Sequence, residues 1–325
     1  MKNLENNLNK NSDAIYALSS GIGKAGVAVF RISGDQDIIL DVVCKMTKLN
    51  IDVVLSQPRY AFFSEIFHSK NQEKIDDAII IYFPAPHSFT GECVLEIQSH
   101  GGFAVVQSVL DSLSLIPNLK IAERGEFTKR AFFNGKMDLL QVEGLADLID
   151  ANTDVARRIA MSQMSGKFSS VMADVREKLI LALSLATAQI DFLYDEANTG
   201  GEKKSSDAIQ NQMVSFVNEV LKILEKTLSN HSGEIIRSGI LVAIIGAPNV
   251  GKSSLFNAII GREKSIISEI PGTTRDVVDA VVDIGGIAVE LADTAGLRDT
   301  IDKIESEGIA RAIKRAENSD IKILV

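Results

Sequence analysis

The 325-residue sequence contains two cysteines and six prolines, and no residue type dominates it. Cys44 and Cys93 are too few and too far apart for a disulfide framework or a CxxC metal site. We therefore expect a reducing, cytoplasmic compartment. The apolar fraction of 46% excludes a disordered or collagen-like chain. The length provides material for two or three packed domains.

The sequence also lacks a long hydrophobic run and an excess of basic residues. Its longest apolar stretches, 179–188 and 240–245, are too short to cross a bilayer, and residues 1–7 hold no apolar core of a signal peptide. We expect no targeting segment and no membrane association. The net charge of −9 argues against a protein that mainly coats nucleic acid. Only the short strip 124–136 is locally basic.

Three regions differ in their hydrophobic pattern, and they predict a multidomain fold. Residues 1–122 combine strand-like segments at 13–18, 27–32, 78–83 and 93–98 with helical periodicity at 35–47 and 103–115, which predicts an α+β domain. Residues 123–237 carry apolar residues at helical spacing, with long helices starting near Val155, Val171 and Asp207, and predict an all-α domain. Residues 238–325 alternate strands at 240–245, 277–284, 287–292 and 321–325 with helices at 252–260 and 305–316, which predicts a partial P-loop α/β domain.

A phosphate-binding motif opens the third region. Residues 246–253 (GAPNVGKS) fit G-x-x-x-x-G-K-[ST], after a predicted strand and before a predicted helix. Backbone amides of such a loop converge on phosphate oxygens, Lys252 reaches the β- and γ-phosphates, and the Ser253 hydroxyl suits Mg²⁺. An ordinary strand–turn–helix junction is the alternative, and the complete motif disfavours it.

Two further segments predict a nucleotide switch. Residues 293–296 (DTAG) follow a strand, where Asp293 can hold Mg²⁺ through water and the Gly296 amide can face the γ-phosphate. Residues 272–276 (GTTRD) form a loop whose threonine can complete the Mg²⁺ shell.

Leu297 stands where Ras-type enzymes place the glutamine that orients water, so another group must do this. Glu305 is a candidate, although a solvated first-turn glutamate is the simpler interpretation from the residues alone. Asn249 can cap its loop or coordinate a monovalent cation.

Together with residues 124–136 (RGEFTKRAFFNGK), these motifs resemble the MnmE (TrmE) family of tRNA modification GTPases over essentially the whole chain. The resemblance implies a tetrahydrofolate-binding, dimerising N-terminal domain, a helical domain and a GTPase domain inserted into it. It also implies a flavin-dependent partner, MnmG, in a heterotetramer that adds an aminomethyl or carboxymethylaminomethyl group to C5 of wobble uridine in tRNA. The implied cofactors are GTP, Mg²⁺, K⁺ and 5-formyltetrahydrofolate or a related tetrahydrofolate.

The resemblance also assigns residues to each site. Folate contacts fall on Arg31, Glu96 and Lys136, for which a strand-flanking charge, an outward strand residue and a helix-surface lysine are the structural alternatives. Glu305 falls on the water-orienting catalytic glutamate. Mg²⁺ falls on Ser253 and Thr274, and K⁺ on Asn249, Ser268, Ile270 and Thr273. The implied GTP contacts are Asn249, Val250, Gly251, Lys252, Ser253, Ser254, Ser268, Glu269, Ile270, Pro271, Gly272, Thr273, Thr274, Asp293, Thr294, Ala295 and Gly296.

The sequence departs from the family pattern in two places. Lys24-Ala25-Gly26 stands where the family usually has Arg-Gly-Gly. Only 86 residues run from Ile240 to Val325, no Asn-Lys-x-Asp guanine-reading motif follows, and 321–325 would be a buried strand. We therefore expect a chain truncated within its GTPase domain. A GTPase-inactive folate-binding dimerisation module is the first alternative. A ribosome-assembly GTPase is the second, which the fourteen acidic against ten basic side chains of residues 1–123 disfavour.

Overall fold

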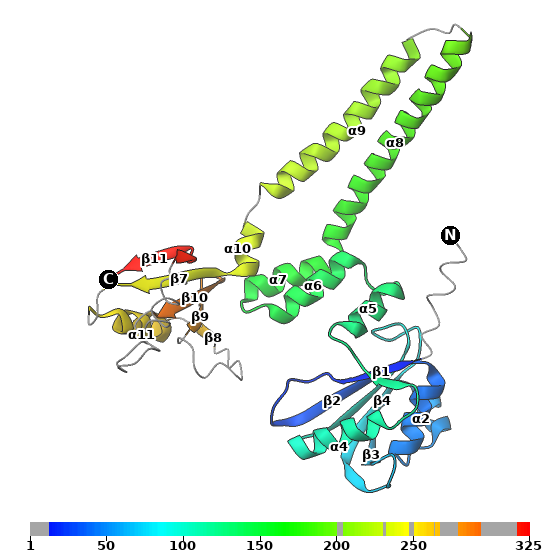
Figure 1. Ribbon diagram of the computed structural model, residues 1–325, viewed down its shortest axis with the longest axis vertical. Helices are drawn as coiled ribbons and strands as arrows, with labels where there is room; N and C mark the ends of the chain where they lie inside the picture. Colours follow the sequence, from blue (N-terminus) through cyan, green and yellow to red (C-terminus); the bar gives the residue numbers. More distant parts are fainter. Residues whose placement is uncertain are drawn as a thin grey trace, which may run out of the picture. The chain divides into compact units, whose positions relative to one another are not determined.

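A computed structural model describes residues 13–199, 204–229, 232–246, 250–262, 264–266, 279–293 and 317–325. The chain divides into two compact units, one ending at Leu139 and one spanning Leu140–Val325 (Figure 1). Within the described ranges, no helix is both long enough and apolar enough for a membrane span.

The first unit is a six-stranded sheet with helices, in the strand order β3-β4-β5-β2-β1-β6. Neighbouring strands are antiparallel except β1 and β6, which are parallel. Its elements are β1 (Ala14–Leu18), β2 (Ala25–Gly34), α2 (Gln36–Met46), α3 (Ile51–Ser56), β3 (Phe62–Phe67), β4 (Lys74–Phe83), β5 (Cys93–Gly101), α4 (Phe103–Ser114), β6 (Leu119–Ile121) and α5 (Glu126–Phe133).

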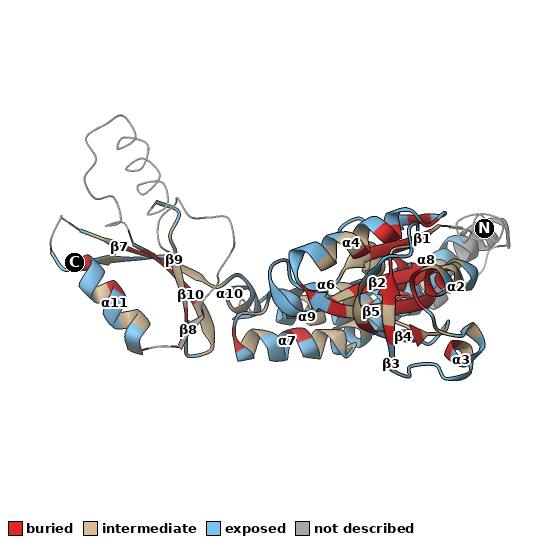
Figure 2. Ribbon diagram, turned by 90° about the horizontal axis from the view of Figure 1, so that it is seen from below, coloured by how far each residue is buried: buried red, intermediate tan, exposed pale blue. Residues whose placement is uncertain are grey.

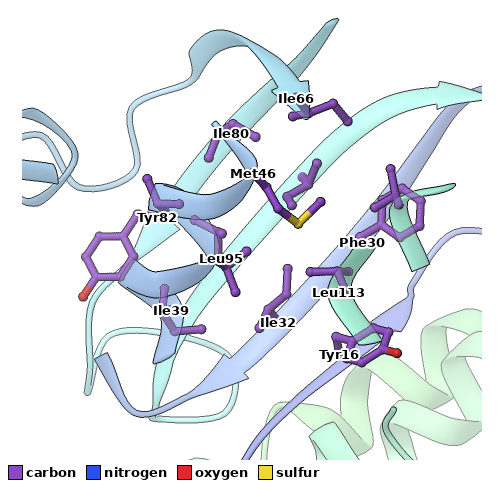
Figure 3. Packing of buried hydrophobic residues seen from close by; sticks show 14 of the residues in the cluster. Tyr16, Phe30, Ile32, Ile39, Met46, Ile66, Ile80, Tyr82, Leu95 and Leu113 are labelled. Atoms are coloured by element: carbon purple, nitrogen blue, oxygen red, sulfur yellow. The ribbon is translucent and has the colours of Figure 1, made fainter. Parts of the chain in front are cut away.

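The core of this unit lies between one face of the sheet and helices α2 and α4 (Figure 3). Alternation along the strands turns Phe30 and Ile32 of β2 to this face. Helix α2 contributes Ile39 and Met46, and α4 contributes Leu113, all of them fully buried. Figure 2 shows the buried positions gathered along these strands and helices. Because successive side chains point to opposite faces, the residues between the core positions of β2 and β5 lie on the other face of the sheet.

The second unit begins with helices. They are α6 (Leu139–Asp150), α7 (Asp154–Met164), α8 (Lys167–Thr199), α9 (Lys204–Leu228) and α10 (Ser232–Ser238). Helices α8 and α9 pack along one another as a long hairpin (Figure 1), with Val175, Ala182 and Val220 buried. The Lys178 Nζ atom lies 3.0 Å from Glu219 Oε2 across this pair.

The remainder of the second unit is a five-stranded sheet with the order β11-β7-β10-β9-β8. Strand β7 is parallel to β10 and β11, and β9 is antiparallel to β10 and β8. The elements are β7 (Ile240–Ile245), α11 (Lys252–Arg262), β8 (Lys264–Ile266), β9 (Asp279–Ile284), β10 (Ile287–Asp293) and β11 (Ile321–Leu324). Phe256 of α11 packs against the buried face of this sheet.

The predicted strands and helices that lie in the described ranges are present. The α+β, helical and P-loop α/β elements follow in the predicted chain order. Sequence reasoning missed β3, β6, β8, α3 and α10. The predicted helix at 305–316 lies outside the described residues. The first unit runs to Leu139 and so takes in α5. The division of the chain at 122/123 and 237/238 stays a prediction.

The expectation that 321–325 is a buried strand is wrong in one respect. Strand β11 forms, but Ile321 is 49% and Leu324 80% exposed. Among the described residues β11 has one neighbouring strand, β7, and it therefore stands at the edge of the sheet.

Candidate functional site

Arg31 and Glu96 form an ion pair on the face of the first sheet opposite the helix-covered core. Their Cα atoms are register partners on β2 and β5. The Arg31 Nε and Nη2 atoms both donate to Glu96 Oε1, at 3.0 and 2.8 Å. The side chains are 30% and 15% exposed, so the pair is reachable from solvent but largely desolvated. The structure thus brings together two of the three residues that the resemblance assigned to folate.

Arg31 and Glu96 each have one polar side-chain atom that takes no part in their ion pair. Among the hydrogen bonds of the described residues, none involves Arg31 Nη1 or Glu96 Oε2. Because Nε and Nη2 both face Glu96 Oε1, Nη1 points away from the carboxylate. The pair therefore offers one donor and one acceptor at separate points, which can bind polar atoms of a heterocycle.

Lys136, the third assigned residue, follows α5 and lies against the loop 84–92. Its Nζ atom donates to the Pro86 carbonyl at 3.0 Å, and Asn134 Nδ2 donates to the Thr90 carbonyl at 2.8 Å. The structure therefore places Lys136 beside the loop, and no contact between Lys136 and the Arg31–Glu96 pair is among the described interactions.

A buried polar network ties α5 to the same loop. Arg130 is 6% exposed in its side chain and donates from Nη1 to both Glu92 carboxylate oxygens, at 3.1 and 3.2 Å. The Glu92 Oε2 atom also accepts from Ser33 Oγ at 2.8 Å, and Ser33 Oγ lies 2.7 Å from Thr90 Oγ1. Arg130 further donates to Asp13 O and to Glu126. The network fixes the loop relative to β2.

Sequence reasoning did not single out two residues of this site, Phe89 and Arg130. The Arg31 Cζ atom lies 5.6 Å from the centroid of the Phe89 ring, within cation–π range. Arg130 belongs to residues 124–136, which carry the resemblance. Arg130 also lies four residues after Glu126 on α5, and this spacing is the only local signal of their ion pair.

The second candidate site is the phosphate loop between β7 and α11. Gly251 has a φ of +107°, a left-handed conformation that favours glycine, directly before α11. The Leu255 amide donates to the Gly251 carbonyl at 2.9 Å and closes the first helical turn. Lys252 is 7% exposed, and its Nζ atom donates to the Gly246 carbonyl at 3.0 Å. The motif thus has the predicted strand–loop–helix context. The Lys252 ammonium group contacts the carbonyl of Gly246, the first glycine of the motif.

Asp293 ends β10 beside this loop. Its Cα partner in the parallel neighbour β7 is Ile244, two residues before Gly246. Val250, Gly251, Lys252, Ser253 and Ser254 lie at the loop and the first turn of α11, as predicted. Hydroxyl oxygen from Ser253 is a hard donor of the kind that Mg²⁺ takes together with phosphate oxygens. The part of the chain with described placement holds no cluster of three acidic, histidine or cysteine ligands.

The other predicted residues of this site lie outside the described residues. They are Asn249, Ser268, Glu269, Ile270, Pro271, Gly272, Thr273, Thr274, Thr294, Ala295, Gly296 and Glu305.

Comparison with known proteins decides the family. A family model described as "GTP-binding protein TrmE N-terminus" matches residues 14–136, and one described as "50S ribosome-binding GTPase" matches residues 241–325. The "tRNA modification GTPase MnmE" of a Wolbachia strain (subsp. Brugia malayi) is 44% identical over 311 residues, covering 96% of this chain and 67% of that protein. The chain belongs to the MnmE family.

Eukaryotic relatives match equally well. The "tRNA modification GTPase gtpbp3, mitochondrial" of Dictyostelium discoideum is 44% identical over 315 residues, or 96% of this chain and 60% of that protein. The "5-taurinomethyluridine-[tRNA] synthase subunit GTPB3, mitochondrial" of Danio rerio is 43% identical over 314 residues, with the same coverage. The chain therefore spans 60 to 67% of the length of these three relatives in the MnmE family.

Proposed function

We propose that this chain binds and hydrolyses GTP as part of a tRNA modification enzyme. The observation that carries the proposal is the phosphate loop between β7 and α11, with Lys252 buried in it and Asp293 at the neighbouring strand end. Backbone amides and the N-terminal end of a helix favour phosphate, and the lysine adds a charge that reaches the β- and γ-phosphates. Ser253 would hold Mg²⁺, which neutralises the charge that develops on the phosphates.

We further propose that the first unit binds a tetrahydrofolate. The Arg31–Glu96 pair offers Nη1 as a donor and Oε2 as an acceptor for polar atoms of a pterin, and Lys136 would supply a cation for the carboxylates of the glutamate tail. The folate would donate the one-carbon unit that tRNA modification at C5 of wobble uridine needs. A homodimer through the first unit and a heterotetramer with an MnmG-type flavoprotein belong to the same proposal, on the family resemblance.

K⁺ binding at Asn249, Ser268, Ile270 and Thr273, Mg²⁺ binding at Thr274, and catalysis by Glu305 are likewise proposed from the resemblance. Potassium would replace the charge of an arginine finger, and Glu305 would orient the attacking water that Leu297 cannot hold. If so, Glu305→Ala lowers GTP turnover in potassium buffer and leaves the affinity for GTP unchanged. Unchanged turnover would remove Glu305 from the mechanism.

The first test is equilibrium binding of fluorescent GDP to the full chain in potassium and in sodium buffer, with ADP and ATP as competitors. We expect guanine-selective binding that Lys252→Ala weakens at least tenfold. The matched control is Lys322→Ala on β11, a lysine outside the phosphate loop. Equal competition by ADP, or equal binding by the Lys252 variant, would contradict the proposal.

A folate-binding dimerisation module without GTPase activity is the second candidate, and one observation favours it. The sheet of the second unit leaves a cavity of about 500 Å³ beside α11, with an apolar lining that includes Ile240, Leu255 and Ile321. An unfilled apolar cavity leaves its lining side chains without packing partners, which lowers the stability of the fold around it. Retained folate binding and dimerisation without GDP binding would support this module.

A further inference from the structure

The loop 84–92 is fastened at several points, and Phe89 lies within it. Arg59 Nη2 donates to the His87 carbonyl at 2.6 Å, and the Ser88 hydroxyl accepts from the Gly91 amide at 3.0 Å. Lys136 and Asn134 hold the carbonyls of Pro86 and Thr90 from the α5 side. The loop therefore presents Phe89 from a backbone that hydrogen bonds fix from both sides.

Phe89 lies beside the Arg31 guanidinium, whose two hydrogen bonds to Glu96 restrict its rotation within its own plane. Two donors of Arg31, Nε and Nη2, go to a single oxygen of Glu96, and the Phe89 ring lies 5.6 Å from Arg31 Cζ. An arginine side chain has several rotatable bonds, and one carboxylate oxygen alone leaves it free to tilt about the shared contact. An aromatic face at cation–π distance opposes that tilt.

We propose that Phe89 is a positioning residue of the folate site, which acts through Arg31. It holds the guanidinium so that Nη1, which points away from the Glu96 oxygen bound by Nε and Nη2, keeps one orientation for donation to the ligand. The proposal rests on the proposed folate function for its ligand, but the orientation of Arg31 is a property of the chain itself. Preorganisation of this kind lowers the entropy that binding must otherwise overcome.

The test compares three variants of the full chain. Phe89→Leu removes the aromatic face and keeps an apolar side chain, and Phe89→Trp restores an aromatic face. Phe133→Leu is the matched control, since Phe133 lies on α5, is 67% exposed and contacts Phe132 instead of Arg31. Calorimetry with 5-formyltetrahydrofolate should show about fivefold weaker binding for Phe89→Leu, from a cation–π contribution near 1 kcal/mol. Phe89→Trp and Phe133→Leu should bind within about twofold of the unchanged chain.

A double substitution separates positioning from direct contact. If Phe89 acts through Arg31, adding Phe89→Leu to Arg31→Gln weakens binding by less than about twofold. A second measurement needs no ligand: in a chain with labelled arginine, hydrogen exchange of the Arg31 Nε–H should be at least severalfold faster in Phe89→Leu than in Phe133→Leu.

The outcomes separate this proposal from the folate proposal. Unchanged folate affinity in Phe89→Leu, full additivity with Arg31→Gln, or unchanged Arg31 Nε–H exchange would each overturn the role of Phe89. Failure of the unchanged chain to bind folate, with faster Arg31 exchange in Phe89→Leu, would overturn the folate function and support the positioning role.

Discussion

The Arg31–Glu96 pair allows a direct test of whether a charged pair serves the fold or the ligand. We consider the double substitution Arg31→Met with Glu96→Leu. The neighbouring Cα partners on this face are Ala17 opposite Arg31 and Ile81 opposite Glu96, so apolar replacements find apolar neighbours. Replacement of a buried ion pair by packed apolar side chains is often neutral or stabilising, by about 1–4 kcal/mol.

The expected magnitudes follow from the exposure of the pair. Because Arg31 is 30% exposed, the cost of desolvating the pair is lower than for a fully buried one. We expect the double variant to lie within about 1 kcal/mol of the unchanged chain in its free energy of unfolding. Each single variant should lose about 1–2 kcal/mol, since a half-buried charge remains without its partner.

The assay is urea unfolding followed by near-ultraviolet circular dichroism, combined with folate calorimetry. Tyr16 and Tyr82 are buried in the first unit and report its tertiary packing. With a slope near 2 kcal/mol per molar urea, the single variants should shift the midpoint by about 0.5–1 M. The double variant should show no such shift but should not bind folate. A loss above about 2 kcal/mol in the double variant would refute this reasoning and make the pair structural.

Three further predictions concern the first unit. Arg130→Met should lower the free energy of unfolding by about 3–5 kcal/mol, because it removes a buried cation that pairs with the partly buried Glu92 and Glu126 carboxylates. Gly34→Ala should destabilise by about 1–3 kcal/mol, since its Cβ would lie 2.5 Å from the Ala14 Cβ. Burial raises the pKa of Asp76, but hydrogen bonds from the His100 amide and ring outweigh it, so the pKa lies below its usual value. The stability from this lowered pKa should be present above about pH 4 and lost as pH falls further.

Each of these predictions is tested by urea unfolding of the variant and of a matched control variant. Lys45→Met removes a surface ion pair and should cost less than about 0.5 kcal/mol. Gly26→Ala places its Cβ where nothing lies within 4 Å and should be close to neutral. For Asp76, the difference in unfolding free energy between the unchanged chain and Asp76→Asn should shrink from about pH 5 to pH 3. A loss in Arg130→Met no larger than in Lys45→Met, a neutral Gly34→Ala, or a pH-independent difference for Asp76 would contradict the respective argument.

The long strands and helices of the first unit could be predicted because their apolar residues alternate or recur at helical spacing. Strands β6 and β8 have three residues each, too few for any periodicity to be detected. Strand β3 carries Phe63 on its exposed face, 75% accessible, which hides the alternation of its buried partners. The phosphate loop could be predicted because its chemistry is local: one contiguous segment supplies the glycines, the lysine and the serine.

The site in the first unit was predictable only through resemblance, because its residues come together by sheet register and loop contacts. Arg31 and Glu96 are 65 residues apart. Phe89 contacts Arg31 through its ring face, and Lys136 contacts the Pro86 carbonyl of the loop 84–92. Contacts of these two kinds leave no pattern in the sequence.

The register that builds the core also builds this site. Phe30 pairs with Ile97 and Ile32 pairs with Leu95 on the core face, and these two rows bracket the Arg31–Glu96 row on the other face. A slip of one residue would turn the charged side chain of β2 into the core and its apolar neighbours out of it. The hydrophobic alternation therefore penalises every register shifted by an odd number of residues, and each of these breaks the pair. The apolar residues that fix the fold thereby also hold the Arg31–Glu96 pair in place.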